Sequence, residues 1–178
     1  DLVRAWLAAG IETLVFKGFH LATFVHERAS DRPYNDVDVA LRGGDAERAR
    51  DVALETGWRL AWEARTSLYR HNHEALILTR EGVVVEVHRL LLDAHRPRHP
   101  VQTRLTEEVW AAASEVDWHD TRLYVPDLVD GLLVGLFLAR AWSRGDDGHL
   151  KPTDWLDLVA ARDRCGVRRE DVTARARA

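Results

Sequence analysis

Residues 36–41 read Asp-Val-Asp-Val-Ala-Leu, so that a large apolar side chain takes every second position. This period of two predicts a β-strand whose valines and leucine enter a core. Asp36 and Asp38 then share the opposite face, roughly 6.6 Å apart along the strand. Two carboxylates at that spacing can hold divalent cations of the kind that clamp the reacting oxygens in phosphoryl transfer. A half-exposed strand with a polar face would show the same pattern, so the neighbouring segments have to decide between the two interpretations.

A second feature is the Lys17-Gly18 pair, which lies between a strand pattern at 12–16 and a helical pattern at 19–28. A glycine at such a turn lets a phosphate approach the backbone, and a helix N-terminus offers free N–H groups and a partial positive charge. Lys17 would add a compact charge for the phosphates. It is one of only two lysines, with Lys151, in a chain whose other permanent cations are arginines. A purely structural turn also explains the glycine.

Two further strands are predicted at 74–79 and 83–88, joined by a hairpin turn that contains a glycine. In the second strand the valines alternate with Glu86 and His88, which therefore share one face. If this strand neighbours residues 36–41, Glu86 completes a cluster of three carboxylates. Such a cluster repels itself, and a bound metal ion would remove that penalty. An exposed strand glutamate and a hydrogen-bonded structural histidine are the plain alternatives.

The whole pattern predicts an α+β fold in two parts. A small mixed β-sheet flanked by helices is expected in residues 1–100, followed by a helical half in 101–178 that closes the cleft. We place the boundary at the stretch rich in proline and histidine that ends at residue 100. The other expected helices are 2–9, 45–56, 101–114, 126–143, 152–165 and 168–178, with extended pieces at 58–64 and 123–125.

The helix at 152–165 is expected to close over the nucleotide or the acceptor. It begins after Lys151 and carries Asp154 and Trp155 in its first turn. A helix N-terminus favours an anion, a lysine neutralises triphosphate charge, and an aromatic face suits a base or an apolar acceptor. A solvated lysine and a tryptophan in the core would fit the same residues.

The composition narrows the class of protein. The chain has 178 residues, 46% of them hydrophobic, and its net charge of −4 argues against a nucleic-acid surface. No apolar run approaches a membrane span, and the single cysteine, Cys165, excludes an internal disulfide and favours a reducing, cytoplasmic setting. Because the chain contains no methionine, we expect residues upstream of Asp1. A zinc hydrolase built on His71, His73, His88 and Cys165 is disfavoured because their spacing matches no known zinc motif.

Three segments carry a resemblance to a known family: 16–22 (Phe-Lys-Gly-Phe-His-Leu-Ala), 32–39 (Arg-Pro-Tyr-Asn-Asp-Val-Asp-Val) and 85–88 (Val-Glu-Val-His). Together they resemble the uncharacterised nucleotidyltransferase family of the DNA polymerase β-type superfamily. Some members of that family are encoded beside genes for lasso peptide biosynthesis. The length and layout are also similar to the small antibiotic nucleotidyltransferases that modify aminoglycosides and lincosamides.

The resemblance implies that Asp36, Asp38 and Glu86 bind metal and carry catalysis, with Mg²⁺ (or Mn²⁺) and an NTP as co-substrate. It implies transfer of a nucleoside monophosphate to a hydroxyl of a small molecule or peptide, such as an antibiotic or a biosynthetic intermediate. A non-catalytic module that binds a nucleotide or a partner is the alternative. Lys17-Gly18 stands where the superfamily usually has Gly-Gly or Gly-Ser, and Glu86 stands where the closer family commonly has Asp. We expect Lys17, Gly18, Arg32, Asn35 and Lys151 at the nucleotide, and His88, Asp154 and Trp155 near the acceptor or in support of the site.

Overall fold

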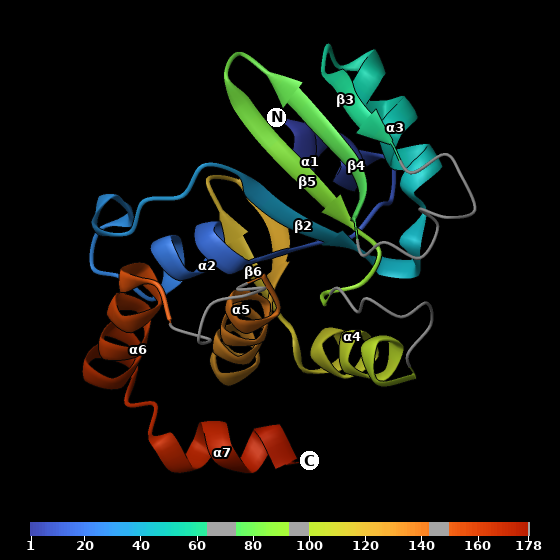
Figure 1. Ribbon diagram of the computed structural model, residues 1–178. Coiled ribbons are helices and arrows are strands. Elements are labelled where there is room, and N and C mark those ends of the chain that lie inside the picture. The colour runs from blue at the N-terminus through green and yellow to red at the C-terminus, as the bar shows by residue number, and fades with distance from the viewer. Residues whose placement is uncertain (64–73, 93–99, 143–149, 178) are drawn as a thin grey trace.

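The computed structural model describes residues 1–63, 74–92, 100–142 and 150–177 (Figure 1). These residues form one seven-stranded mixed sheet in the order β3-β4-β5-β2-β1-β7-β6. β2 pairs in parallel with β5, β1 pairs in parallel with β7, and the other neighbours are antiparallel. The strands are β1 (Thr13–Phe16), β2 (Val37–Leu41), β3 (Arg59–Glu63), β4 (Glu74–Arg80), β5 (Val83–His88), β6 (Ser114–Trp118) and β7 (Thr121–Val125).

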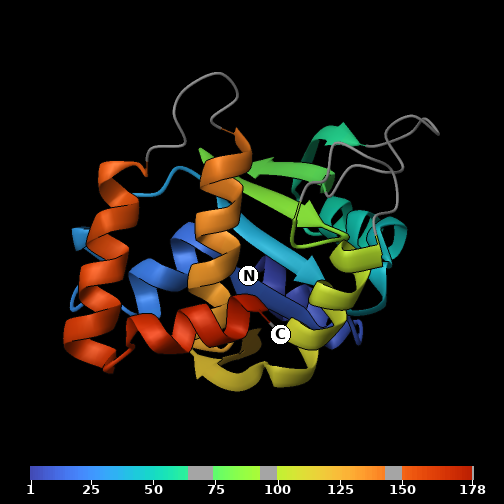
Figure 2. The ribbon, with the colours of Figure 1, turned by 60° about the horizontal axis from the view of Figure 1, so that its bottom comes forward.

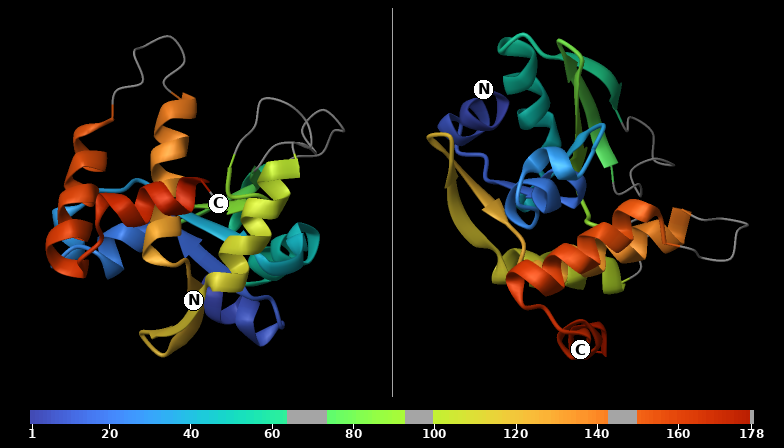
Figure 3. Two further views of the ribbon diagram at one scale, coloured as in Figure 1. Left: turned by 90° about the horizontal axis from the view of Figure 1, so that it is seen from below. Right: turned by 90° about the vertical axis from the view of Figure 1, so that its left-hand side faces the viewer.

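Helices cover both faces of the sheet, and Figure 3 shows α1 and α3 gathered on one side and the C-terminal helices on the other. Two short 3-10 turns, η1 (Ala29–Asp31) and η2 (Arg42–Gly44), flank β2. The helices are α1 (Leu2–Ala8), α2 (Lys17–Phe24), α3 (Ala46–Glu55), α4 (Pro100–Ala112), α5 (Leu128–Trp142), α6 (Pro152–Cys165) and α7 (Arg169–Arg177). Among the helices so described, none is long and apolar enough to cross a membrane.

The alternation of side chains along β1 and β2 places two of the three clusters of the described core on opposite faces of the sheet. Val15 and Val39 pack with α1 and α3, where the indole N–H of Trp6 donates to the carbonyl of Ala49 at 2.8 Å. Phe16 and Ala40 face the other way and pack with residues of α4 and α5. Asp38 has the same strand parity as Ala40, so the polar face that carries the site lies on the side of α4 and α5.

The last helix, α7, lies across the end of α5 and beside α4 (Figure 2), and an arginine fixes it there. Nε of Arg175 lies 2.6 Å from the buried carboxylate of Asp130 on α5, and its Nη1 lies 3.1 Å from Glu108 on α4. A buried carboxylate is costly unless it is paired, so this contact ties three helices together.

The predicted α+β class is confirmed, and the predicted strands occur within one or two residues of their expected ends. One hairpin was missed. Residues 114–118 were expected at the end of a helix or in a loop, but they form β6, and β6 and β7 join the main sheet next to β1. β6 is an edge strand in which only Val116 and Trp118 are apolar, and both are half-buried. An alternation of two apolar residues is too short to separate a strand from the end of the preceding helix. The C-terminal part is therefore not entirely helical, while the division of the chain at residue 100 stays a prediction.

Candidate active site

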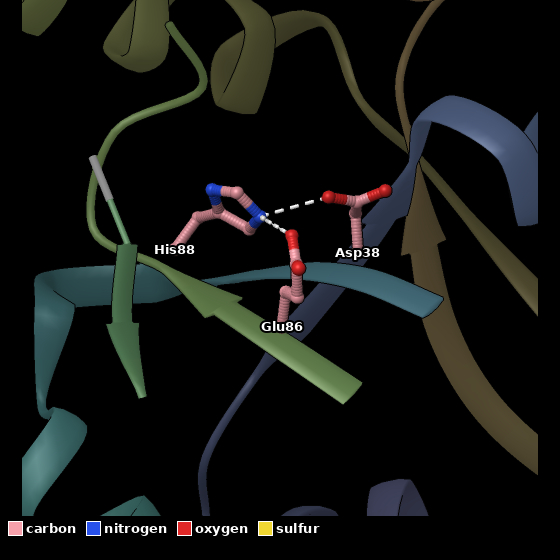
Figure 4. Close-up of side chains that lie close together, drawn as sticks. All are labelled: Asp38, Glu86 and His88. Carbon is pink, nitrogen blue, oxygen red and sulfur yellow. Dashed lines mark hydrogen bonds and ion pairs between the residues drawn. The ribbon is translucent and has the colours of Figure 1, made fainter. Parts of the chain in front are cut away.

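The parallel pairing of β2 with β5 determines which residues meet. Asp38 lies opposite Glu86 in the register, and Ala40 lies opposite His88. Val39 and Val87 between them are fully buried in the opposite core cluster, which fixes the faces on which the polar residues lie. As a result, Asp38, Glu86 and His88 converge, with one ligand atom of each lying within 4.8 Å of the others (Figure 4).

His88 supports this cluster from inside the core. Its side chain is completely buried, its Nε2 lies 2.9 Å from Oδ1 of Asp38, and the same nitrogen lies 3.8 Å from Glu86. The edge of the ring packs against Phe16 at 5.0 Å between centroids. An ionised carboxylate only accepts hydrogen bonds, so the imidazole donates to Asp38 and fixes its orientation.

Lys17 reaches the same aspartate from the other side. Phe16 pairs with Asp38 across the antiparallel β1–β2 ladder, and the ammonium of the next residue, Lys17, forms an ion pair with Oδ1 of Asp38. Burial acts to raise the pKa of Asp38, but the hydrogen bond from His88 and the charge of Lys17 outweigh it and leave this pKa below its usual value. Asp38 is therefore a buried carboxylate that keeps its charge.

The turn into α2 depends on the backbone of Lys17 and on the absence of a side chain at Gly18. Lys17, not Gly18, adopts a left-handed backbone, with φ of 52°. A Cβ at Gly18 would lie 2.7 Å from Nη1 of Arg32 and 2.8 Å from Cβ of Tyr34. The glycine thus makes room for the side chain of Arg32 against the first turn of α2.

Asp36 lies immediately before β2 and is half-buried. Its pKa is raised, first by burial and then by the negative charge of Asp38. It lines the same cleft as Asp38 and Glu86, although the tight cluster contains His88 in its place. The three carboxylates predicted from the sequence therefore face one cavity, two of them in direct register.

This cavity has a volume of about 480 Å³ and lies between the ends of β2 and β5 and the helices α2, α5 and α6. Its polar side carries the carboxylates and Lys17. Its apolar side is formed by Leu21, Leu132, Leu136 and Leu158. All five residues expected at the nucleotide line it: Lys17, Gly18, Arg32, Asn35 and Lys151.

The residues expected from α6 are placed differently. Asp154 lines the cleft and also caps the helix by accepting the backbone N–H of Lys151 at 2.8 Å. Trp155 is 59% exposed and is absent from the described lining of the cleft. His71 and His73 lie outside the described residues, and Cys165 is exposed.

Asp157 is a site residue that the sequence analysis missed. It is 3% exposed on α6, lines the cleft, and accepts hydrogen bonds from Arg32 at 3.0 and 3.1 Å. Its spacing of four residues from the buried Ala161 would have placed it on the inner face of the helix. That position was the available signal, because acidic residues are rarely buried without a specific partner.

The donor set fits a divalent cation. Carboxylate oxygens from Asp38, Glu86 and Asp36 are the ligands that Mg²⁺ and Mn²⁺ prefer. The ammonium of Lys17 already lies against Asp38 as a positive charge next to this cluster. Clustered carboxylates of this kind are stabilised by a cation, whether an ammonium or a metal ion.

The fold resembles several solved nucleotidyltransferases. ANT(2'')-Ia, solved in complex with adenylyl-2''-tobramycin, aligns with a TM-score of 0.64 at 10% identity over 97% of this chain and 89% of that one. The lincosamide antibiotic adenylyltransferase LnuA, solved with lincomycin bound, aligns at 0.55 and 13% identity over 89% of this chain and 90% of that one. An antigenic nucleotidyltransferase-like protein from Paracoccidioides brasiliensis aligns at 0.56 and 12% identity over 89% and 71%. At these identities the likeness shows a shared fold.

Among curated protein sequences, none matches the chain. The model of one protein family, described as uncharacterised nucleotidyltransferase, matches residues 1–178. This match spans the sheet, the carboxylate cluster and the helices that enclose the cleft, and it confirms the family predicted from the three motif segments. The chain belongs to the uncharacterised nucleotidyltransferase family.

Proposed function

We propose that this nucleotidyltransferase moves a nucleoside monophosphate from an NTP to a hydroxyl oxygen of a small molecule, with the help of Mg²⁺ or Mn²⁺. The observation that carries the proposal is the register of Asp38 with Glu86 beside Lys17, at the wall of a cleft that Asp36 also lines. These groups are what an in-line phosphoryl displacement requires: carboxylates for metal, cations for phosphates, and a cavity for two substrates.

The metal would be held by Asp36, Asp38 and Glu86, with His88 keeping Asp38 in orientation through its 2.9 Å contact. When bound, such an ion neutralises charge at the reacting phosphate and lowers the pKa of an attacking hydroxyl. Asp38 is already ionised in this structure, because His88 and Lys17 keep its pKa low. The carboxylate is therefore ready to bind a cation without first losing a proton.

The phosphates would lie against the first turn of α2. Lys17 and the backbone N–H groups of that turn offer positive charge and donors, and Arg32 and Lys151 also line the cleft. Each of these cations comes from a different part of the fold. The triphosphate would thus be held between the sheet and α6.

The acceptor would occupy the remaining part of the cleft, next to the leucines of α2, α5 and α6. A cavity of about 480 Å³ falls in the range of small-molecule sites. Two structural neighbours were solved with an adenylylated antibiotic or an antibiotic. We therefore propose a small molecule as the acceptor, and this includes antibiotics and biosynthetic intermediates with a free hydroxyl.

The test is a transfer screen with labelled NTPs and a panel of hydroxyl-bearing small molecules, in the presence of Mg²⁺ or Mn²⁺. Formation of a nucleotidylated product with release of pyrophosphate is expected, and Glu86→Gln should abolish it because one carboxylate of the cluster is lost. Full activity in Glu86→Gln would contradict the assignment. Nucleotide binding by calorimetry without transfer to any acceptor would favour a non-catalytic binding module instead.

A further inference from the structure

We propose that Asp157 is a positioning residue, which holds Arg32 in the orientation that receives the triphosphate of the nucleotide and so couples α6 to the phosphate-binding turn. The inference rests on the proposed function. It concerns a buried carboxylate outside the metal cluster, on an element that is distant from Arg32 in the sequence.

Asp157 is a buried carboxylate with two specific partners. Its side chain is 4% exposed and binds two cationic or hydrogen-bonding partners from the segment between α2 and β2. Arg32 makes a bidentate contact, with Nε at 3.0 Å and Nη2 at 3.0 Å from the carboxylate oxygens. Nε2 of His26 lies 2.8 Å from the same carboxylate. A carboxylate that is buried in this way needs such partners, since unpaired it would be strongly destabilising.

The contact leaves one edge of the guanidinium available. A guanidinium has five N–H groups, and Asp157 receives those of Nε and one or both of Nη2. Nη1 points toward the first turn of α2, where a Cβ at Gly18 would lie only 2.7 Å from it. In the structure Nη1 also donates to the carbonyl of Pro33 at 3.3 Å. Nη1 therefore lies at the turn where the phosphates are proposed to bind.

Two features together set this geometry. The planar fork of an arginine keeps its orientation when two of its nitrogens bind one carboxylate. The missing side chain at Gly18 provides the space in which Nη1 lies. The side chain of Arg32 is 13% exposed, so it reaches the cleft from a partly buried position, and without Asp157 it would lose the contact that sets the direction of Nη1. Asp157 would then act on the nucleotide through Arg32, without touching it.

A merely structural ion pair would also join α6 to the loop before β2, and a double-mutant cycle separates the two roles. The probe is inorganic tripolyphosphate with Mg²⁺, titrated calorimetrically at low salt into the full chain. The proteins are wild type, Asp157→Asn, Arg32→Gln and the double variant. Asp163→Asn is the matched control, because Asp163 is an exposed acid on the same helix that pairs with its neighbour Arg162.

We expect Asp157→Asn to weaken tripolyphosphate binding about tenfold, the scale of one charge-assisted contact. Arg32→Gln should weaken it at least as much, and Asp157→Asn should add no further loss in that background. Asp163→Asn should bind as wild type does. In the transfer assay Asp157→Asn should raise KM for the NTP and leave kcat in place.

An unchanged affinity for tripolyphosphate in Asp157→Asn would overturn the inference. So would a result in which Asp157→Asn weakens binding as much in the Arg32→Gln background as it does in the wild type. If Asp157→Asn does not fold, Arg32→Lys serves in its place, since it keeps the charge and loses the fork; full affinity in Arg32→Lys would equally overturn the inference. Failure of the wild-type protein to bind tripolyphosphate would instead overturn the proposed function, and this would be seen before any variant is compared.

Discussion

Lys17 and His88 contact the same oxygen of Asp38, one as an ion pair from the start of α2 and the other as a hydrogen bond from the end of β5. The negative charge of Asp38 is therefore compensated before any ligand arrives. Lys17 is also the residue of the turn that adopts a left-handed backbone. The side chain of Lys17 thus compensates the charge of Asp38, while its backbone adopts a conformation that usually favours glycine.

The backbone of Lys17 gives the first prediction. Lys17→Gly and Lys17→Ala both remove the ammonium, so their difference reports the left-handed conformation at φ of 52°. We expect Lys17→Gly to be about 1 kcal/mol more stable than Lys17→Ala, because a Cβ is disfavoured in that region. Urea unfolding of both variants measures the difference. Equal or greater stability of the alanine variant would show that the residue is not left-handed.

The two aspartates of the strand should differ in what they do for stability. Asp38→Asn should abolish transfer and also lower the free energy of unfolding, because Lys17 and His88 lose the carboxylate that they share. Asp36→Asn should abolish transfer with stability unchanged or raised, because burial and the charge of Asp38 disfavour the Asp36 carboxylate. Transfer assays and urea unfolding of the two variants test this. Equal stability of the two would contradict the assigned contacts.

A pH dependence of stability is expected from His20, which is 3% exposed on α2. Burial lowers its pKa to about 4, against the opposing charges of Asp127 and Asp157. The unfolded chain binds a proton below about pH 6.5 and the folded chain does not, so this stability is complete above pH 6.5 and is lost as pH falls toward 4. The loss is about 3 kcal/mol over that window.

His20→Gln serves as the reference for this measurement, since it keeps a polar side chain of similar size and does not titrate. The free energy of unfolding of wild type relative to His20→Gln should fall between pH 7 and pH 4. The difference cancels the carboxylates that titrate in both proteins. A constant difference across the range would mean that His20 takes up its proton over the same pH range in the folded and unfolded protein, and would contradict its burial.

Two glycines of α5 should respond oppositely to alanine. A Cβ at Gly131 would lie 2.7 Å from Cε1 of His20, whereas a Cβ at Gly135 has nothing within 4 Å in the described residues. Gly131→Ala should therefore destabilise the protein by about 1–3 kcal/mol through overpacking. Gly135→Ala should stabilise it by about 0.5–1 kcal/mol, because alanine favours a helix. Thermal unfolding of both variants is the measurement, and a stable Gly131→Ala would refute the close packing of α2 on α5.

The sequence predicted that Asp38 and Glu86 share one face of the sheet, for a physical reason. Along β2 and β5 a period of two fixes which side chains share a face, and buried valines decide which face is polar. Asp38 and Glu86 could therefore be placed on one side of two strands. Their adjacency depended on the pairing of β2 with β5, which the motif resemblance suggested and the sheet order establishes.

The outer wall of the site could not be predicted in the same way. Asp157 and Arg32 are separated by 125 positions, and no local period links an acid on one helix to an arginine in a distant loop. Edge strand β6 was missed because its apolar alternation consists of only two half-buried residues, Val116 and Trp118. Tertiary contact and position at a sheet edge, and not local propensity, determined both features.

The place of β2 in the middle of the seven strands also determines how long its amide hydrogens persist. Its neighbours β5 and β1 bond it on both sides, so its N–H groups can exchange with solvent only when the sheet opens as a whole. The loop that carries Arg32 and the helix that carries Asp157 lie at the periphery, where local openings cost far less. Over minutes to hours in deuterated water, the backbone amides of β2 should thus keep their hydrogens after those of the Arg32 loop and of α6 have exchanged.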